Sequence, residues 1–356
     1  MRNEADLESG LMLALRYEGE ADVKVVDVPK PSIKDPTDVL VRVTLSAVCG
    51  SDLHIYHGRI PGCEGSVLGH EFVGTVEDAG SEVRRFRPGD RVVSSFFSSC
   101  GHCYYCRRGW FNQCASKATF GYGVHFGALG GGQAEFVVVP LADHTLEPIP
   151  SDLSDEQAIF VGDILATGFF AAERAEIEAG DTVAVIGAGP VGLMSIMSAQ
   201  LFGPARIFVV DMVGSRLELA QGIGAIPINA AQTEPVEAIK NATGGFGTDR
   251  SIEAVGLLSA IETAINCVRG GGTISTVGVP NHTSGEFPYL LAWSKALTFR
   301  SGWCNVQAYM RRLLELIAAG RLKPDTIISH RMKLEEGEEA YRIFDAREAT
   351  KIVLTP

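Results

Sequence analysis

The chain has 356 residues, of which 46% are hydrophobic and 21% are charged, and its formal net charge is −12. The length favours two domains over a single core, and the composition is that of a globular protein. The acidic balance argues against nucleic acid or an anionic membrane as a partner. Residues 1–10 are polar and lack the apolar segment of a signal peptide, so we expect an extension there and a cytoplasmic protein. The eight cysteines are then expected to be metal ligands or free thiols rather than disulfides.

Short β-type runs separated by glycine and proline make up the chain from Met12 to about residue 150. The predicted strands lie in the segments 11–17, 39–48, 71–80, 87–93 and 134–140. Runs at such regular spacing are typical of a closed or partly closed antiparallel barrel. The first part of the chain is therefore predicted to be a β-rich domain.

From about residue 164 onward, strands alternate with helices, which predicts a parallel, doubly wound sheet. Strands are expected at 183–186, 207–210, 226–228, 249–254 and, after a glycine turn, 271–279, with helices at 214–223, 234–242 and 257–268. An amphipathic helix is expected within 303–320, where the alternation ends. The pattern alone does not assign the last strand, 351–356, to either sheet.

The stretch from Thr182 to Asp211 carries a glycine motif between a predicted strand and a predicted helix. Gly187, Gly189 and Gly192 form G-x-G-x-x-G. The first glycine allows a tight turn, the second lets the backbone approach a pyrophosphate, and the third lets helix and strand pack closely. The N–H groups at the start of the helix would hold the phosphates, and Asp211 would accept hydrogen bonds from the adenosine ribose. The motif therefore predicts a dinucleotide site.

Other interpretations of this stretch are weaker. The segment between Asp181 and Arg206 has no charged residue and resembles a membrane span, but glycines and polar side chains interrupt it and no second span exists. An ordinary glycine-rich loop would not place a strand, a helix and a terminal acid in this order. The carboxylate of Asp211 would repel a 2′-phosphate, which favours NAD over NADP, and Arg216 is the one nearby cation that could offset this.

A second motif, CGHCYYCRRGWFNQC, contains four cysteines spaced C-x2-C-x2-C-x7-C. They are Cys100, Cys103, Cys106 and Cys114. Two-residue gaps let neighbouring thiolates face one ion, and the fourth thiolate closes a tetrahedron with no open position, which is typical of a structural zinc. The closing gap and the missing Cys-Pro argue against an iron–sulfur cluster, and the compartment argues against two disulfides.

Cys49 follows a predicted strand in CGSDLH, and His70 and Glu71 lie in LGHEFVG. Each residue alone is more often structural than a ligand. Together with the four-cysteine lobe, GGGQAEFV and GAGPVG, their order resembles the zinc-containing alcohol dehydrogenases of the medium-chain dehydrogenase/reductase family. The resemblance covers the chain from Met12 to Pro356.

The resemblance implies a catalytic zinc held by Cys49, His70 and a third ligand, and Asp163 takes the matching place. A thiolate, a neutral imidazole and a carboxylate would leave one coordination position open. Asp163 could instead cap the helix that follows it. Glu71 is implied either as a neighbour of the ligands or as an alternate fourth ligand. With the four-cysteine lobe, the expectation is two zinc ions per chain.

The resemblance also implies the chemistry. Zinc would make the hydroxyl group of a bound alcohol more acidic, and the nicotinamide of NAD would take up the hydride. The released proton would reach solvent through Ser51, the cofactor ribose and His54, unless Ser51 is a turn residue and His54 a surface histidine. Asp52 is a candidate to orient a ligand histidine.

Further positions match cofactor and substrate contacts of the family, with Lys351 expected near the pyrophosphate and three valines near the nicotinamide. The cofactor set comprises Thr167, Gly187, Gly189, Pro190, Val191, Gly192, Asp211, Arg216, Val255, Val277, Val279 and Lys351. Candidate pocket walls are His57, Phe96, Trp110 and Trp303. Apolar walls suit a small or medium alcohol.

The implied α/β architecture has a GroES-like barrel domain over 1–163 and 302–356, with the zinc lobe near 96–116, and a Rossmann domain over 164–301. The active site is expected in the cleft between them, and the protein is expected to be a homodimer or homotetramer. The expected reaction is the reversible NAD-dependent oxidation of a primary or secondary alcohol. The alternatives are a formaldehyde, short-aldehyde, polyol or threonine dehydrogenase, a zinc-free quinone reductase, and an NAD-binding protein without catalytic activity.

Overall fold

The computed structural model describes residues 10–281 and 284–356. This part of the chain forms two compact units, a first unit made of the chain up to Asp163 together with Asn305–Pro356, and a second unit, Ile164–Cys304. The first unit is therefore discontinuous in sequence. The predicted extension over residues 1–10 lies outside the described residues except for Gly10.

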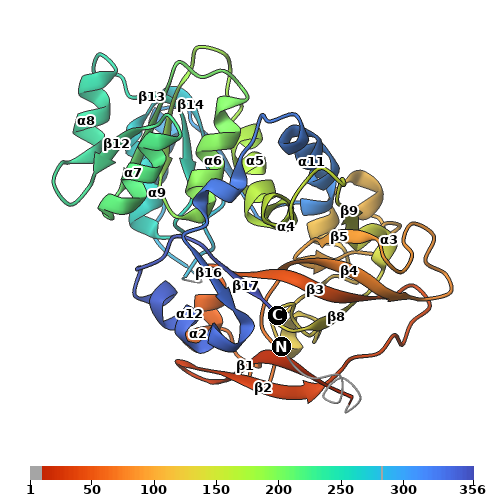
Figure 1. Ribbon diagram of the computed structural model, residues 1–356. Helices are drawn as coiled ribbons and strands as arrows, with labels where there is room; N and C mark the ends of the chain where they lie inside the picture. The colour runs from red at the N-terminus through yellow and green to blue at the C-terminus, as the bar shows by residue number, and fades with distance from the viewer. Residues whose placement is uncertain (1–9, 282–283) are drawn as a thin grey trace. The chain divides into compact units, whose positions relative to one another are not determined.

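A mostly antiparallel sheet forms the centre of the first unit (Figure 1). Within the described residues its strands run in the order β16-β17-β3-β4-β5-β9, and β8 also pairs with β3. The strands are β3 (Val39–Val48), β4 (Glu71–Ala79), β5 (Arg91–Ser94), β8 (Phe136–Val139), β9 (Leu146–Pro148), β16 (His330–Lys333) and β17 (Ile352–Thr355). The ladders follow an open path, so the described strands do not form a fully hydrogen-bonded closed barrel.

Smaller elements complete the first unit. A hairpin of β1 (Leu11–Gly19) and β2 (Asp22–Pro29) contacts α2 (Asp52–Tyr56) and α12 (Gly337–Asp345). The remaining elements are the short strands β6 (Phe97–Ser98) and β7 (Ala118–Thr119), the helices α3 (Ala142–Thr145), α4 (Asp155–Ala158) and α11 (Met310–Ala318), and the 3₁₀ turn η4 (Ile159–Gly162). The helix α11 is shorter than the predicted 303–320, because a separate 3₁₀ turn at Val306–Ala308 precedes it.

Strand β17 joins the two sequence segments of the first unit. It pairs antiparallel with β3, so that Ile352 lies opposite Val48 and Leu354 lies opposite Ser46. Ile352, Val353 and Leu354 are all buried, so both faces of β17 pack in the interior. The pairing places Lys351, which precedes β17, close to the end of β3.

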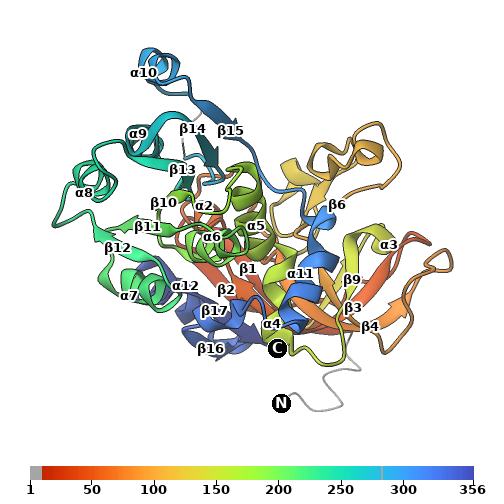
Figure 2. The same ribbon diagram turned by 90° about the horizontal axis from the view of Figure 1, so that it is seen from above.

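The second unit contains a parallel sheet, which in the described chain has the strand order β12-β11-β10-β13-β14-β15. Successive strands are added on one side of β10 as far as β12, and then on its other side from β13 to β15. This is the strand order of a Rossmann fold. Figure 2 shows α8 and α9 on one side of the strands and α6 and α7 on the other. The strands are β10 (Thr182–Ile186), β11 (Arg206–Asp211), β12 (Ile226–Asn229), β13 (Thr248–Glu253), β14 (Val268–Thr276) and β15 (Thr298–Ser301). The helices are α5 (Ile164–Arg174), α6 (Pro190–Gln200), α7 (Gly214–Gly222), α8 (Pro235–Ala242), α9 (Leu258–Cys267) and α10 (Tyr289–Ser294).

The predicted strand over 271–279 was wrong in its bounds. The glycine run at 270–272 is not a turn before the strand but a bulge within it, where the pairing shifts between Thr248↔Val268 and Arg250↔Thr273. The strand therefore begins at Val268 and ends at Thr276. As a result, Val277 and Val279 follow the end of the strand instead of lying within it.

We expect the substitution Gly192→Ala to destabilise the second unit. A Cβ atom at Gly192 would lie 1.9 Å from the carbonyl oxygen of Gly187, so α6 would have to move away from the preceding turn. The expected loss is about 1–3 kcal/mol in the free energy of unfolding, measured by urea denaturation. In the control Gly222→Ala, the new Cβ meets no atom within 4 Å, and we expect no loss of stability. Equal stability of the two variants would contradict the close packing at Gly192.

Candidate functional site

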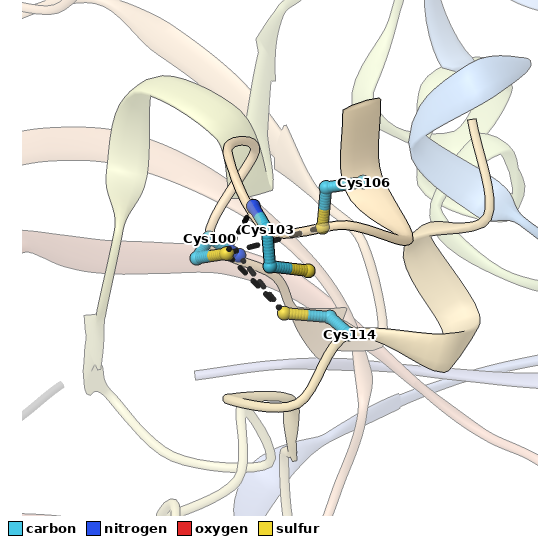
Figure 3. A group of neighbouring side chains, drawn as sticks. All are labelled: Cys100, Cys103, Cys106 and Cys114. Carbon is cyan, nitrogen blue, oxygen red and sulfur yellow. Dashed lines mark hydrogen bonds between the residues drawn. The ribbon is translucent and has the colours of Figure 1, made fainter. Parts of the chain in front are cut away.

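The four cysteines of the CGHCYYCRRGWFNQC segment converge as their spacing predicts. Figure 3 shows the side chains of Cys100, Cys103, Cys106 and Cys114 turned toward a common point. Their sulfur atoms all lie within 4.8 Å of one another, and the Sγ atoms of Cys100 and Cys114 are 3.5 Å apart, too far for a disulfide. A left-handed residue, Gly109, ends the 3₁₀ turn that carries Cys106 and reverses the chain toward Cys114.

Backbone amides donate to several of these sulfur atoms and act to lower their thiol pKa, whereas burial raises the pKa of Cys106 and Cys114. The N–H of Cys103 donates to Sγ of Cys100 at 3.4 Å, and the N–H groups of Cys100 and Ser116 donate to Sγ of Cys114 at 3.3 and 3.4 Å. The amide of Cys106 is the largest cause that lowers the pKa of the Cys103 thiol, to about 6. Four converging sulfur atoms with amide donors fit a tetrahedral zinc ion with no open position.

A second group of metal-ligand side chains lies in the interior of the first unit. Cys49, His70, Glu71 and Asp163 each offer one ligand atom within 4.8 Å of the others. The antiparallel pairing of β3 with β4 sets Ala47 opposite Glu71, which brings Cys49 beside His70. Asp163 follows η4, and its Oδ2 lies 3.1 Å from Nε2 of His70 and 3.6 Å from Sγ of Cys49. A thiol, an imidazole nitrogen and a carboxylate oxygen that face one point are a donor set suited to zinc.

Glu71 differs from the other three because its carboxylate already has a counter-charge. The Nζ atom of Lys351 lies 2.9 Å from Oε1 and 2.7 Å from Oε2 of Glu71, and both side chains are fully buried. Burial is the largest single influence and acts to lower the pKa of Lys351, but Glu71, Cys49 and Asp163 together raise it, so the lysine stays charged. Burial also raises the pKa of Glu71, to about 7, although Lys351 acts to lower it. This position differs from the expected contact of Lys351 near the pyrophosphate, because its ammonium group is enclosed beside the metal-ligand group.

The imidazole of His70 is held on both sides. Its Nδ1 atom lies 3.1 Å from Oδ1 of Asp52, and its Nε2 atom lies 3.3 Å from Oγ of Ser51 as well as facing Asp163. Burial acts to lower the pKa of His70, yet the nearby carboxylates, Asp52 first, raise it well above its usual value. Because Nδ1 faces Asp52, Nε2 is the nitrogen that points at Cys49 and Asp163.

The two predicted relay residues, Ser51 and His54, lie at the start of α2 and within it. His54 is partly buried, and burial, followed by the positive charge of Arg59, lowers its pKa, so the ring is neutral near pH 7. Its backbone N–H donates to the carbonyl of Ser51 at 3.1 Å. His57, predicted as a pocket wall, instead pairs through Nε2 with Oδ1 of Asp345 at 2.8 Å.

Of the predicted aromatic pocket walls, Phe96 lies beside the metal-ligand group of the first unit. Its ring stacks edge-on with His70 at a centroid distance of 6.1 Å. Tyr122, which the sequence analysis did not single out, lies closer, at 5.5 Å from the His70 ring. Trp110 is 46% exposed on the cysteine lobe, and Trp303 belongs to the second unit. No local motif marks Tyr122, so only the folded chain reveals it.

The glycine motif has the geometry that a dinucleotide site requires. Gly187 has φ of 100°, Gly189 is the N-cap of α6, and Pro190 and Val191 begin this helix. Asp211 ends β11, and its carboxylate accepts hydrogen bonds from the amides of Ala188, Met212 and Val213 at 2.7, 2.7 and 2.9 Å. These bonds hold the acid beside the first turn of the motif.

The other predicted cofactor positions in the second unit differ in how exposed their side chains are. Val255 and Val279 are 41% and 53% exposed, whereas Val277 and Thr167 are buried. The guanidinium of Arg216 reaches the glycine turn, since its Nη1 lies 3.9 Å from where a Cβ of Gly189 would be. Arg216 therefore lies near the expected phosphate position.

Comparison with known proteins shows which family the chain resembles. Residues 35–151 match the alcohol dehydrogenase GroES-like domain, and residues 190–319 match the zinc-binding dehydrogenase family. The chain is 37% identical over 352 residues to zinc-type alcohol dehydrogenase B of Aspergillus flavus, covering 96% of this chain and 81% of that protein. It is 35% identical over 355 residues to an alcohol dehydrogenase of Cupriavidus necator, covering 94% and 96%.

Among solved structures, the alcohol dehydrogenase TADH from Thermus sp. ATN1 superposes with a TM-score of 0.93 at 47% identity, covering 97% of this chain and 99% of that one. The chain belongs to the zinc-type alcohol dehydrogenase family. The predicted resemblance and the predicted two-domain α/β fold class are confirmed. As a member of this family the protein is an oxidoreductase. In the described residues, no helix is both long and apolar enough to cross a bilayer.

We expect Lys351→Met to destabilise the protein strongly. The substitution keeps an apolar stem but leaves the Glu71 carboxylate buried without its counter-charge, which typically costs about 3–5 kcal/mol. The double variant Lys351→Met/Glu71→Gln removes both charges and should recover a large part of this loss. Urea denaturation at a fixed zinc concentration measures the free energy of unfolding of the single and the double variant. The substitution of an exposed lysine, Lys34→Met, is the control. If Lys351→Met is as stable as Lys34→Met, the buried pair does not stabilise the fold.

Proposed function

We propose that this protein is a zinc-dependent, NAD-linked alcohol dehydrogenase that interconverts a primary or secondary alcohol and its carbonyl compound. The observation that carries this proposal is the convergence of Cys49, His70 and Asp163 in the interior of the first unit. These residues come from three separate segments of the chain, and their ligand atoms face one another. Three protein ligands leave a position open for substrate.

In this proposal Cys49, His70 and Asp163 hold the catalytic zinc, and the four-cysteine lobe holds a structural zinc. Bound zinc would supply Lewis acidity toward the oxygen of the substrate. Of the two expected roles of Glu71, we propose that of a neighbour of the ligands rather than a fourth ligand, because Nζ of Lys351 contacts both of its oxygen atoms. Asp52 fixes the ring of His70 by facing Nδ1, which leaves Nε2 for the metal.

Ser51 and His54 are proposed to carry the proton of the alcohol toward solvent. The hydroxyl of Ser51 lies within 3.3 Å of the ligand histidine, so it borders the proposed site of the reacting oxygen. His54 is three residues further along, half-buried, and its lowered pKa keeps it neutral and able to accept a proton near pH 7. The rings of Phe96 and Tyr122, which flank His70, are proposed to border the substrate.

The second unit is proposed to bind NAD through the glycine motif and Asp211. The amide groups at the start of α6 suit a pyrophosphate, and the nicotinamide would accept the hydride. The fixed carboxylate of Asp211 at the end of β11 suits ribose hydroxyl groups and disfavours a 2′-phosphate. Val255, Val277 and Val279, at and beyond the ends of β13 and β14, are proposed as contacts of the nicotinamide.

We also propose that the two units act as a GroES-like catalytic domain and a Rossmann cofactor domain, in a cytoplasmic homodimer or homotetramer. A reducing compartment would suit the eight cysteines, which are free in the described structure. Self-association is supported by β15, the last strand of its sheet, which is exposed beside the apolar side chains of Tyr289, Leu290 and Trp293.

Asp163→Ala should remove one of about two zinc ions per chain and most of the alcohol-dependent reduction of NAD. Loss of the metal removes several kcal/mol of stabilisation of the developing charge, so we expect kcat/KM to fall at least about 100-fold. Elemental analysis counts the metals, and absorbance of NADH measures turnover across primary, secondary, polyol and aldehyde substrates. The exposed Asp152→Ala serves as control. Retention of both metals in Asp163→Ala would show that Asp163 only caps α5, and saturable NAD binding without any turnover would favour a non-catalytic protein.

Asp211→Asn should shift the cofactor preference toward NADP. The amide keeps the shape of the side chain and an acceptor for the backbone but removes the charge that would face a 2′-phosphate. We expect the ratio of kcat/KM for NAD to that for NADP to fall about 10-fold, equivalent to about 1.4 kcal/mol. Glu218→Gln, an exposed carboxylate on α7, is the matched control. An unchanged ratio would exclude Asp211 as the residue that selects NAD.

A further inference from the structure

We propose that Tyr341 and Gln133 are positioning residues for the catalytic metal site and act through Asp52 on the ligand histidine. A buried chain of contacts runs from the hydroxyl of Tyr341 on α12 through the Gln133 amide and the Asp52 carboxylate to the ring of His70. This inference rests on the proposed metal site and extends it to residues far from the ligands in sequence.

Asp52 is the member of this series of side-chain contacts that touches the proposed metal ligands. Its Oδ2 atom accepts a hydrogen bond from the backbone N–H of Cys49 at 2.9 Å, and its Oδ1 atom lies 3.1 Å from Nδ1 of His70. Among the described residues neither Oδ1 of Asp52 nor Nδ1 of His70 has a hydrogen-bond partner elsewhere, so each faces the other. One carboxylate therefore touches two proposed ligand residues, and a small rotation of it would move both.

Gln133 limits that rotation. Its Nε2 donates to the carbonyl of Ala47 at 3.1 Å and to Oδ2 of Asp52 at 3.4 Å, while its Oε1 accepts from the hydroxyl of Tyr341 at 2.9 Å. Because two acceptors face Nε2 and a donor faces Oε1, the amide has a single satisfied orientation. The hydroxyl of Tyr341 supplies the donor that opposes a flip of this amide.

The backbone of Gln133 is also packed against the segment that carries His70. Its N–H donates to the carbonyl of Leu68 at 2.9 Å, and its carbonyl accepts from the N–H of Leu15 at 2.8 Å. A Cβ atom on Gly69 would lie 2.5 Å from Cγ of Gln133, so only glycine allows this approach. The side chain of Gln133 is thus anchored at a fixed place next to the metal-binding segment.

Because these side chains are buried, the loss of any one of them is expected to disturb the contacts of the others. Asp52, Gln133 and Tyr341 are each 0% exposed, and a buried polar group without a partner is costly. Burial, followed by the charge of Asp52, raises the pKa of Tyr341 well above its usual value, so its hydroxyl remains a donor. Removal of that donor leaves Oε1 of Gln133 unsatisfied and frees the amide to turn away from Asp52.

The test compares metal affinity in the full-length variants Tyr341→Phe and Gln133→Leu. Competition with a chelator gives the dissociation constant of cobalt(II) at the site that Asp163→Ala abolishes, and the cobalt absorption bands report the geometry there. For Tyr341→Phe we expect the dissociation constant to rise about 3-fold to 10-fold, and for Gln133→Leu about 10-fold to 100-fold. Both should shift the cobalt bands, whereas the four-cysteine site retains its metal and serves as an internal control.

Tyr56→Phe is the matched control, because Tyr56 packs against Tyr341 at a ring distance of 5.7 Å but has no contact with Gln133 in this chain of bonds. Since the residues act in series, the double variant Tyr341→Phe/Gln133→Leu should bind cobalt no more weakly than Gln133→Leu alone. The inference is overturned if Tyr341→Phe leaves the affinity and the bands as in Tyr56→Phe, or if both metal sites weaken equally. If the parent protein binds no metal at the Asp163 site, the proposed function itself fails.

Discussion

The balance of buried charge at the end of β3 constrains the rest of the first unit. Cys49, Glu71 and Asp163 lie together in the interior, where Lys351 contacts Glu71 and His70 contacts Asp163. Burial and then the Glu71 carboxylate raise the pKa of the Cys49 thiol, so the thiolate needs an added cation. Lys351 pairs with Glu71, so the proposed zinc ion would balance the charge of Cys49 and Asp163.

Short motifs proved the most predictable part of this molecule, because each one carries its own geometry. The two-residue gaps between cysteines and the spacing of Gly187 and Gly192 define turns that depend on few distant contacts. The alternation of strands and helices likewise predicted the second sheet. The exception was β14, where a glycine run that usually marks a turn is a bulge, held in place by pairing with Thr248.

Residues whose roles depend on distant partners could not be predicted in this way. The partner of Lys351 is Glu71, 280 positions earlier, so the sequence suggested a contact with cofactor where the structure has a buried ion pair. Gln133 stood in a recognised segment, GGGQAEFV, but its link to Tyr341 spans 208 positions. Tyr122 belongs to no motif at all. Such contacts arise only when β17 and α12 join the earlier strands.

The discontinuity of the first unit has a consequence for biosynthesis. On a ribosome, β3 and β4 emerge well before β17, and the whole of Ile164–Cys304 is translated in between. Glu71 therefore remains without its ammonium partner while the second unit is made and can already fold. Closing so long a loop is slow in folding terms. We expect a nascent chain with a finished nucleotide-binding fold and an unfinished metal pocket, so that zinc loading is a late event in maturation.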